Sequence, residues 1–352
     1  EWNKYTINDL ATVVGGGTPD TTVKSYWGGD IQWFTPSEIG KNKYVDFSKR
    51  TITRDGLDNS SAKLLPLHTI LLSSRATVGE CSIASNECTT NQGFQSLIAK
   101  QCNIDFLYYL IQTKKKDLIR NACGSTFLEI SANEIRKIKV AVPVQNEQEQ
   151  IAKLLSLIDE RIATQNKIIE KLQSLIKGLA AQLTQSGTPN IRLCDCLECH
   201  SSTLQENCVS VTGSYPVYGA TGLIGYTNNY AYNGESILIV KDGSGVGSLS
   251  YVNDHFSVIG TLNYLTAKEN YSILYLYYAL MAFNFTPYIT GMAIPHIYFK
   301  DYGKAKLFYP SIEKRIRIAS LLHNIEQKLV VEQNLVISLS AQKSYLLRML
   351  FI

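Results

Sequence analysis

Gly124-Ser125-Thr126-Phe127-Leu128-Glu129-Ile130 has a counterpart later in the chain, Gly291-Met292-Ala293-Ile294-Pro295-His296-Ile297. The offset between the two stretches, from 124 to 291, is 167 residues. The same offset, without a gap, places Pro143 on Pro310 and Leu154-Leu155 on Leu321-Leu322. A register kept over so many residues indicates a tandem repeat.

The repeat extends upstream with its apolar residues kept and its polar residues changed. Ile70-Leu71-Leu72 matches Ile237-Leu238-Ile239 at the same offset, and Val78-Gly79 matches Val246-Gly247 after one inserted residue. Before this point the second unit is shorter than the first. The residues between the two matched segments therefore differ in chemistry within a common apolar framework.

Each unit is predicted to contain short strands followed by one long helix. Turn residues such as Gly15–Pro19 and Asp242–Gly245 separate the strands. After Pro143, Asn146 and Glu149 have the spacing of a capping box, and Ser311 opens the counterpart helix.

Apolar residues then recur at three- and four-residue steps in each helix. About 40 residues correspond to roughly 60 Å of helix at 1.5 Å per residue. An antiparallel coiled coil would bury both apolar stripes. The alternative is that each helix packs only on its own domain.

The predicted fold class is α+β, with two tandem α/β domains separated by two long antiparallel helices that form a coiled coil. The expected boundaries are a first domain at 1–144, a first helix at 145–186, a second domain at 187–309 and a second helix at 310–352.

Composition excludes several classes of protein. The chain has 352 residues, 45% of them hydrophobic, and no run approaches the roughly 20 apolar residues of a membrane helix. The first residues do not resemble a secretion signal, so the eight cysteines are expected to be thiols of a cytoplasmic protein. A net charge of +4 is compatible with a nucleic-acid partner without requiring one.

Catalytic motifs are not evident. Neither a methyltransferase cofactor loop with its Asn/Asp-Pro-Pro-aromatic motif nor a Gly-Lys-Ser/Thr phosphate loop is present, and no Asp…Glu-x-Lys nuclease core is evident. Gly243–Gly247 follows a strand-like run and is interpreted as a hairpin turn. The five histidines lie outside any recognisable catalytic context.

A cysteine-rich segment resembles a metal site at first sight. It contains Cys194, Cys196, Cys199, His200 and Cys208. When the starts of the two units are aligned, Asn8-Asp9-Leu10 with Cys194-Asp195-Cys196, Cys196 falls on Leu10 and Cys199 on Val13, which are apolar positions of a short helix-like segment. No metal is therefore expected.

The order of these motifs resembles the specificity subunits of type I restriction-modification enzymes. The resemblance rests on a Gly-Gly-Thr-Pro turn (Gly16–Pro19), the Ile70–Gly79 element, Gly124–Thr126 and a Pro-x-x-x-Glu-Gln-x-x-Ile helix start (Pro143–Ile151). In the second unit Gly213–Gly219 and Gly222–Tyr226 are similarly typical, whereas Lys314-Arg315 departs from the first helix start.

The resemblance implies a non-catalytic subunit that reads a bipartite, asymmetric double-stranded DNA target, one half-site per unit. The long helices would act as the spacer. Two modification subunits would supply S-adenosylmethionine and adenine N6 chemistry, and restriction subunits would supply ATP-driven translocation and cleavage with Mg. No cofactor is expected on this chain, and no membrane partner.

Candidate DNA contacts follow from the changed polar residues. They are Ser73, Ser74, Arg75, Thr77, Ser125, Thr126 and Glu129 in the first unit, and Lys241, Asp242, Ser244, His296, Tyr218 and Thr221 in the second. The basic residues Lys41, Lys43, Arg50 and Arg54 either follow phosphates or form an ordinary charged surface. Leu155 and Leu322 are expected to face outward and bind partner subunits.

Two other classes of protein remain as alternatives: a DNA methyltransferase or nuclease with degenerate motifs, and a coiled-coil scaffold that does not read DNA. Methyl transfer by the chain alone would favour the first. Sequence-independent binding to random duplexes would favour the second.

Overall fold

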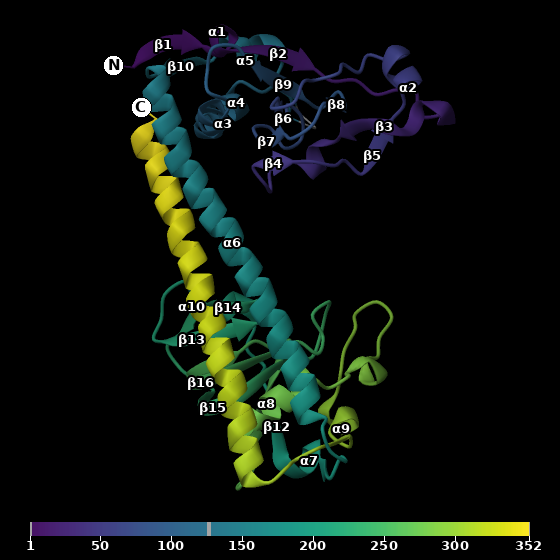
Figure 1. The fold of residues 1–352 in the computed structure, drawn as a ribbon. Coiled ribbons are helices and arrows are strands. Elements are labelled where there is room, and N and C mark those ends of the chain that lie inside the picture. Colours follow the sequence, from purple (N-terminus) through teal and green to yellow (C-terminus); the bar gives the residue numbers. More distant parts are fainter. Residues whose placement is uncertain (1, 125–127, 352) are drawn as a thin grey trace. The chain divides into compact units, whose positions relative to one another are not determined.

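The computed structural model describes residues 2–124 and 128–351 and divides into two compact units (Figure 1). Unit 1 comprises residues 1–165 with 335–352, and unit 2 comprises residues 166–334. Each long helix therefore contributes one part to each unit. The halves of each helix fall in different units, because each half packs with the domain beside it.

Unit 1 combines a five-stranded sheet of order β2-β9-β6-β7-β4, a three-stranded sheet of order β5-β3-β8 and the β1-β10 pair. Its elements are β1 (Asn3–Thr6), α1 (Ile7–Leu10), β2 (Ala11–Gly15), β3 (Trp27–Phe34), β4 (Tyr44–Val45), β5 (Arg50–Ile52), α2 (Arg54–Asp58), β6 (Ile70–Leu72), β7 (Cys81–Ala84), β8 (Cys88–Thr90), β9 (Gln95–Ala99), α3 (Ile104–Thr113), α4 (Lys115–Arg120), α5 (Ala132–Lys137) and β10 (Lys139–Val142).

Unit 2 contains a six-stranded sheet of order β12-β17-β15-β16-β13-β14 and the β11-β18 pair. Its elements are β11 (Ile191–Arg192), α7 (Leu193–Cys196), β12 (Leu197–Ser201), β13 (Tyr215–Gly219), β14 (Gly222–Thr227), β15 (Tyr232–Val240), β16 (Leu249–Val258), β17 (Leu262–Ala267), α8 (Ile273–Met281), α9 (Phe299–Tyr302) and β18 (Lys306–Leu307). Most ladders in both units are antiparallel, in agreement with the predicted α+β class.

The repeat seen in the sequence is a repeat of elements. The short helices α1 and α7 open the two units, β1 pairs with β10 as β11 pairs with β18, and α5 and α9 precede these last strands. The units differ in their early parts, where unit 1 has the β5-β3-β8 sheet and unit 2 has the β13-β14 hairpin. The shorter early part of the second unit is thus accounted for.

The predicted long helices are present as α6 (Gln145–Thr184, 40 residues) and α10 (Ile312–Leu350, 39 residues). The predicted cap at Asn146 is wrong, because the helix already begins at Gln145. The amides of Glu147 and Gln148 donate to the Val144 carbonyl at 3.0 and 3.1 Å. Ser311 does precede α10, and its carbonyl accepts from the Arg315 amide at 3.0 Å.

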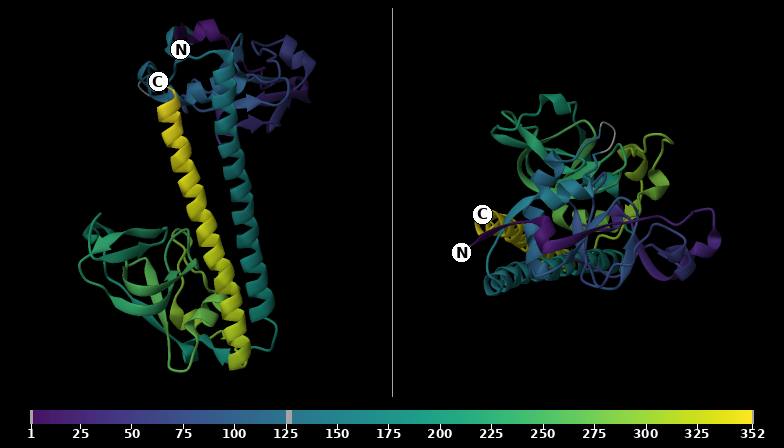
Figure 2. Two further views of the ribbon diagram at one scale, coloured as in Figure 1. Left: turned by 60° about the vertical axis from the view of Figure 1, so that its left-hand side comes forward. Right: turned by 90° about the horizontal axis from the view of Figure 1, so that it is seen from above.

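The two long helices lie side by side within each unit and pack on that unit's domain (Figure 2). In unit 1, Leu155 of α6 is part of the core against which Leu346 and Leu350 of α10 pack. In unit 2, Ala180 of α6 and Leu322 of α10 share the core. The apolar stripes are therefore buried both by the partner helix and by the domain.

Leu155 and Leu322 do not face outward, so their predicted partner-binding role is wrong. Both have 0% exposure and lie in the cores of their units. The exposed member of each repeated pair is the preceding leucine, with 44% exposure at Leu154 and 46% at Leu321.

In the described parts of the chain, none of the helices combines the length and the apolar character that a membrane-spanning helix needs.

We expect Leu155→Ala to lower the free energy of unfolding by about 2–5 kcal/mol, because it opens a cavity in a closed core. Leu154→Ala, one residue away and exposed, is the control and should change it by no more than about 0.5 kcal/mol. Denaturant unfolding of the two variants measures the difference, and equal losses would contradict the assigned helix orientation.

Candidate nucleic-acid interface

Each unit carries a turn between two strands of its main sheet, at equivalent positions. In unit 1 it joins β6 to β7, and the Ser73 amide donates to the Glu80 carbonyl while the Gly79 amide donates to the Ser73 carbonyl, at 2.8 and 3.0 Å. In unit 2 it joins β15 to β16, and the Val240 amide donates to Ser248 while the Gly247 amide donates to Val240, at 3.0 and 2.8 Å. The predicted hairpin turn at Gly243–Gly247 is confirmed. These turns are called the first loops.

A second loop in each unit closes on itself through a pair of backbone hydrogen bonds. The residues Cys123 and Glu129 exchange two bonds of 2.9 Å. The equivalent residues Thr290 and His296 exchange bonds of 2.9 and 2.8 Å. Ser125 and Thr126, two predicted DNA contacts, lie outside the described residues.

Backbone hydrogen bonds join the first and second loops of each unit in the same way. In unit 1 the Ile130 amide donates to the Ser74 carbonyl at 2.9 Å and the Ala76 amide to Leu128 at 3.2 Å. In unit 2 the Ile297 amide donates to Lys241 and the Gly243 amide to Pro295, both at 2.9 Å. The two regions of changed polar residues thus form one surface per unit, which we call the loop pair.

The loop pair of unit 1 exposes a cation and an anion. The Arg75 and Glu129 side chains are 47% and 50% exposed, and their Nε and Oε2 atoms are 3.8 Å apart. An exposed pair of this kind contributes at most about 1 kcal/mol to stability. Breaking this ion pair therefore costs little free energy. Arg75 can then donate to acceptors on a base edge, and Glu129 can accept from donors there. Thr77 is exposed beside them.

The loop pair of unit 2 presents different chemistry. Ser244 is exposed, and Lys241, Asp242 and His296 are half-buried. Nδ1 of His296 lies 3.2 Å from the Ile294 carbonyl oxygen.

The second loops also carry exposed apolar side chains. Met292 is fully exposed, Ile294 is 64% exposed, and Leu128 of unit 1 is 43% exposed. Apolar groups of this kind can contact the thymine methyl group. Met292 also stands where the aligned residue of the first unit is Ser125, so the second loops of the two units differ in sequence at this position.

Ser73 and Ser74 are not available to DNA, so their predicted role in base contact is wrong. Both are fully buried under the first loop. The Ser73 hydroxyl lies 2.9 Å from the Thr77 hydroxyl and donates to the Arg75 carbonyl at 3.1 Å. Ser73 follows directly on the buried strand β6, so its side chain lies beneath the turn. These hydrogen bonds of its hydroxyl hold the turn in place.

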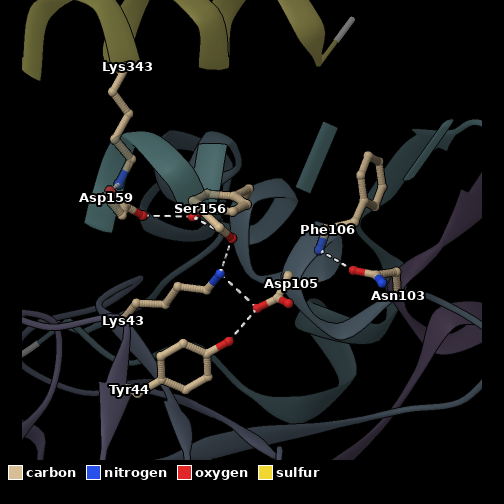
Figure 3. Close-up of polar contacts among 9 residues, drawn as sticks. Lys43, Tyr44, Asn103, Asp105, Phe106, Ser156, Asp159 and Lys343 are labelled. Atoms are coloured by element: carbon tan, nitrogen blue, oxygen red, sulfur yellow. Dashed lines mark hydrogen bonds and ion pairs between the residues drawn. The ribbon is translucent and has the colours of Figure 1, made fainter. Parts of the chain in front are cut away.

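One member of the predicted basic stretch has a largely buried side chain. Lys43 is wrong as a phosphate contact, because its side chain is only 9% exposed and its Nζ lies 2.7 Å from Asp105 Oδ1 (Figure 3). Arg50 stacks its guanidinium 3.7 Å from the centre of the Trp27 ring. Lys41, Arg50 and Arg54 are exposed and remain predicted phosphate contacts, with Arg54 also paired to Asp58 at 3.2 Å.

Tyr218 and Thr221 lie in the β13-β14 hairpin of unit 2. Thr221 is exposed in the turn, and Tyr218 is half-buried with its ring 6.4 Å from that of Phe256. Burial raises the pKa of Tyr218, so its hydroxyl stays protonated at neutral pH. Both residues remain predictions.

Cys196 behaves as an apolar residue, in agreement with its alignment to Leu10. It lies in the core of unit 2 with 0% exposure, and burial raises the pKa of its thiol to about 12. Such a thiol is a poor metal ligand at neutral pH. Within the described ranges, no three His, Cys, Asp or Glu side chains are grouped so as to hold a metal.

Two domains built on one plan, each with a loop pair of its own chemistry and a share of two long helices, define a tandem recognition protein. The model of the type I restriction modification DNA specificity domain matches residues 1–174 and 191–339. The chain belongs to this family of DNA specificity subunits. Its class is therefore that of a recognition subunit rather than a catalytic one, as predicted.

Individual relatives agree with this family. The specificity subunit of the type I restriction enzyme MjaIX from Methanocaldococcus jannaschii is 39% identical over 183 residues, which span 49% of this chain and 42% of the relative. The EcoprrI specificity subunit of Escherichia coli is 25% identical over 93% of this chain and 87% of the relative.

The fold is also found in a solved structure. This chain can be superposed on a type I restriction-modification S subunit from M. genitalium with a TM-score of 0.68. The aligned residues cover 100% of this chain and 96% of the S subunit, and 19% of them are identical. At this identity the likeness concerns the fold alone. It supports the predicted α+β architecture of two domains with long helices.

The backbone of the first loops provides a test of their equivalence. Ala76 has φ 64° and its counterpart Gly243 has φ 96°, with nothing within 4 Å of a Cβ added to Gly243. A side chain at such a φ costs about 1–2 kcal/mol. We expect Gly243→Ala to lower the free energy of unfolding by about 1 kcal/mol and Ala76→Gly to cause no loss. Thermal unfolding of both variants checks this, and a loss in Ala76→Gly with none in Gly243→Ala would contradict it.

Proposed function

We propose that this chain reads a bipartite, asymmetric DNA duplex, one half-site through the loop pair of each unit. The observation that carries this proposal is the equivalence of the loop pairs. The same backbone hydrogen bonds hold both, while Arg75 and Glu129 in one are replaced by Asp242 and His296 in the other. Two like frames with different side chains fit two unlike half-sites.

Arg75 is the side chain best suited to base recognition in unit 1. Its guanidinium is exposed, and an arginine that donates two hydrogen bonds to guanine is the most frequent specific contact in the major groove. Glu129, beside it, accepts from the cytosine amino group. Lys41, Arg50 and Arg54 add sequence-independent affinity through phosphates.

The catalytic steps belong to other subunits. Type I specificity subunits work in complexes with modification and restriction subunits. We infer that two modification subunits supply S-adenosylmethionine and adenine N6 methylation, and that restriction subunits use ATP and Mg for translocation and cleavage. The present chain supplies recognition in the cytoplasm, and we propose that it binds no cofactor.

The exposed apolar positions of the long helices are candidates for docking a modification subunit. Leu154 and Leu157 in α6, and Leu321 and Val331 in α10, are 44–58% exposed. Apolar side chains repeated along a helix face beyond the buried stripe favour a helical or apolar partner surface.

We expect Leu154→Glu or Leu321→Glu to weaken binding of the modification subunit by tenfold or more. Burying one leucine side chain at an interface contributes about 1.5–3 kcal/mol, and a loss of about 1.4 kcal/mol lowers the affinity tenfold. Leu67→Glu, a change at an exposed leucine outside the helices, is the control. Calorimetric titration measures the affinity, and an unchanged affinity in both helix variants would rule out docking at these positions.

We expect Arg75→Ala to relax the target at one position of one half-site, at a cost of about 1–3 kcal/mol in discrimination. The readout is the methylated motif in DNA from cells that express the chain with its modification subunit. Lys137→Ala, an exposed cation on α5, should leave the motif unchanged. If Arg75→Ala retains every position of the motif at full stringency, Arg75 does not read a base.

A further inference from the structure

One acidic residue occurs at the same repeat position of each long helix. Asp159 of α6 and Glu326 of α10 are separated by the offset of the tandem repeat, 167 residues. The Tyr109 hydroxyl of α3 donates to Asp159 Oδ2 at 2.7 Å. The Tyr277 and Tyr278 hydroxyls of α8 donate to the two carboxylate oxygens of Glu326 at 2.9 and 2.7 Å. In both units, the long helix is thus bonded to the helix that lies on the domain's sheet.

Asp159 also joins the second long helix to this contact. Its Oδ1 atom lies 2.6 Å from Nζ of Lys343 on α10 (Figure 3). The Asp159 and Lys343 side chains are only 21% and 19% exposed, so their attraction is less screened than that of a surface pair. One carboxylate therefore holds α3 on one oxygen and α10 on the other.

A second branch reaches the same stretch of α6 from the loop before β4. Lys43 Nζ donates to Ser156 Oγ at 2.6 Å and pairs with Asp105 at 2.7 Å (Figure 3). The Tyr44 hydroxyl donates to the same Asp105 oxygen at 2.8 Å. We call Lys43, Asp105, Tyr109, Ser156, Asp159 and Lys343 the helix clamp of unit 1.

The polar character of the clamp suggests a role beyond cohesion. The apolar core around Leu155 already holds the helix to the domain. A partly buried ion pair adds little net stability relative to apolar residues, but its directional bonds are satisfied in only one register. A slide of α6 along the domain by one residue, about 1.5 Å, would break the bonds of both Ser156 and Asp159.

We propose that Asp159 and Glu326 are positioning residues that set how many base pairs separate the two half-sites. This inference rests on the proposed function. Each residue fixes the height at which a recognition domain is held on the helix pair, and duplex DNA advances about 3.4 Å per base pair. A displacement of a domain by about two residues along the helices, ~3 Å, is then sufficient to change the accepted spacing by nearly one base pair.

The test compares methylated motifs in cells that express the chain with its modification subunit. For Asp159→Asn and for Tyr109→Phe, which removes only the hydroxyl, we expect unchanged half-sites together with targets whose spacer is about one base pair longer or shorter, given the ~3.4 Å rise. Glu326→Gln should act in the same way. The unaltered chain should accept one spacer length.

Two controls separate positioning from stability. Glu160→Gln makes the same change of charge on the next, exposed residue of α6. Ile70→Val weakens the buried core of unit 1 without touching the clamp. Both should keep the single spacer.

If Asp159→Asn and Tyr109→Phe lower the melting temperature as Ile70→Val does and keep one spacer, the clamp is only structural and the inference is overturned. If the unaltered complex methylates no bipartite target, the proposed function fails and the inference fails with it.

Discussion

Burial of the long helices' apolar stripes is the constraint on which both units depend. A helix of 40 residues has little stability of its own in water without a packed face. Leu155 and Leu322 contribute about 1.5–3 kcal/mol each when fully buried. These residues also belong to the cores of the two domains. The apolar surfaces of the helices and of the domains are therefore buried only when the two pack together.

This sharing of cores has a consequence for the recognition surfaces. The loop pairs are held by backbone hydrogen bonds that do not depend on which side chains point outward. Evolutionary change of an exposed residue such as Arg75 or Ser244 therefore leaves the frame intact. Buried residues beneath the loops, such as Ser73, are tied to the frame instead.

Apolar and polar contacts have different roles in joining each domain to the long helices. Apolar contacts around Leu155 supply cohesion, which is largely insensitive to direction. The carboxylates of Asp159 and Glu326 supply direction, because a hydrogen bond weakens steeply when its geometry is lost. Burial and these acceptors raise the pKa of Tyr109 and Tyr278, so both hydroxyls remain donors throughout the physiological range.

The sequence by itself determined the tandem repeat, the two long helices and the two divergent loop regions of each unit. These features follow from local periodicity and from the spacing of matched segments. Both can be read from the order of residues along the chain. Only the tertiary structure decided that Leu155 is buried and Leu154 exposed, that Ser73 lies under its loop, and that Lys43 pairs with Asp105. Each of these depends on a partner distant in the chain or on a helix face shared between two surfaces, and such long-range contacts are set by packing in three dimensions.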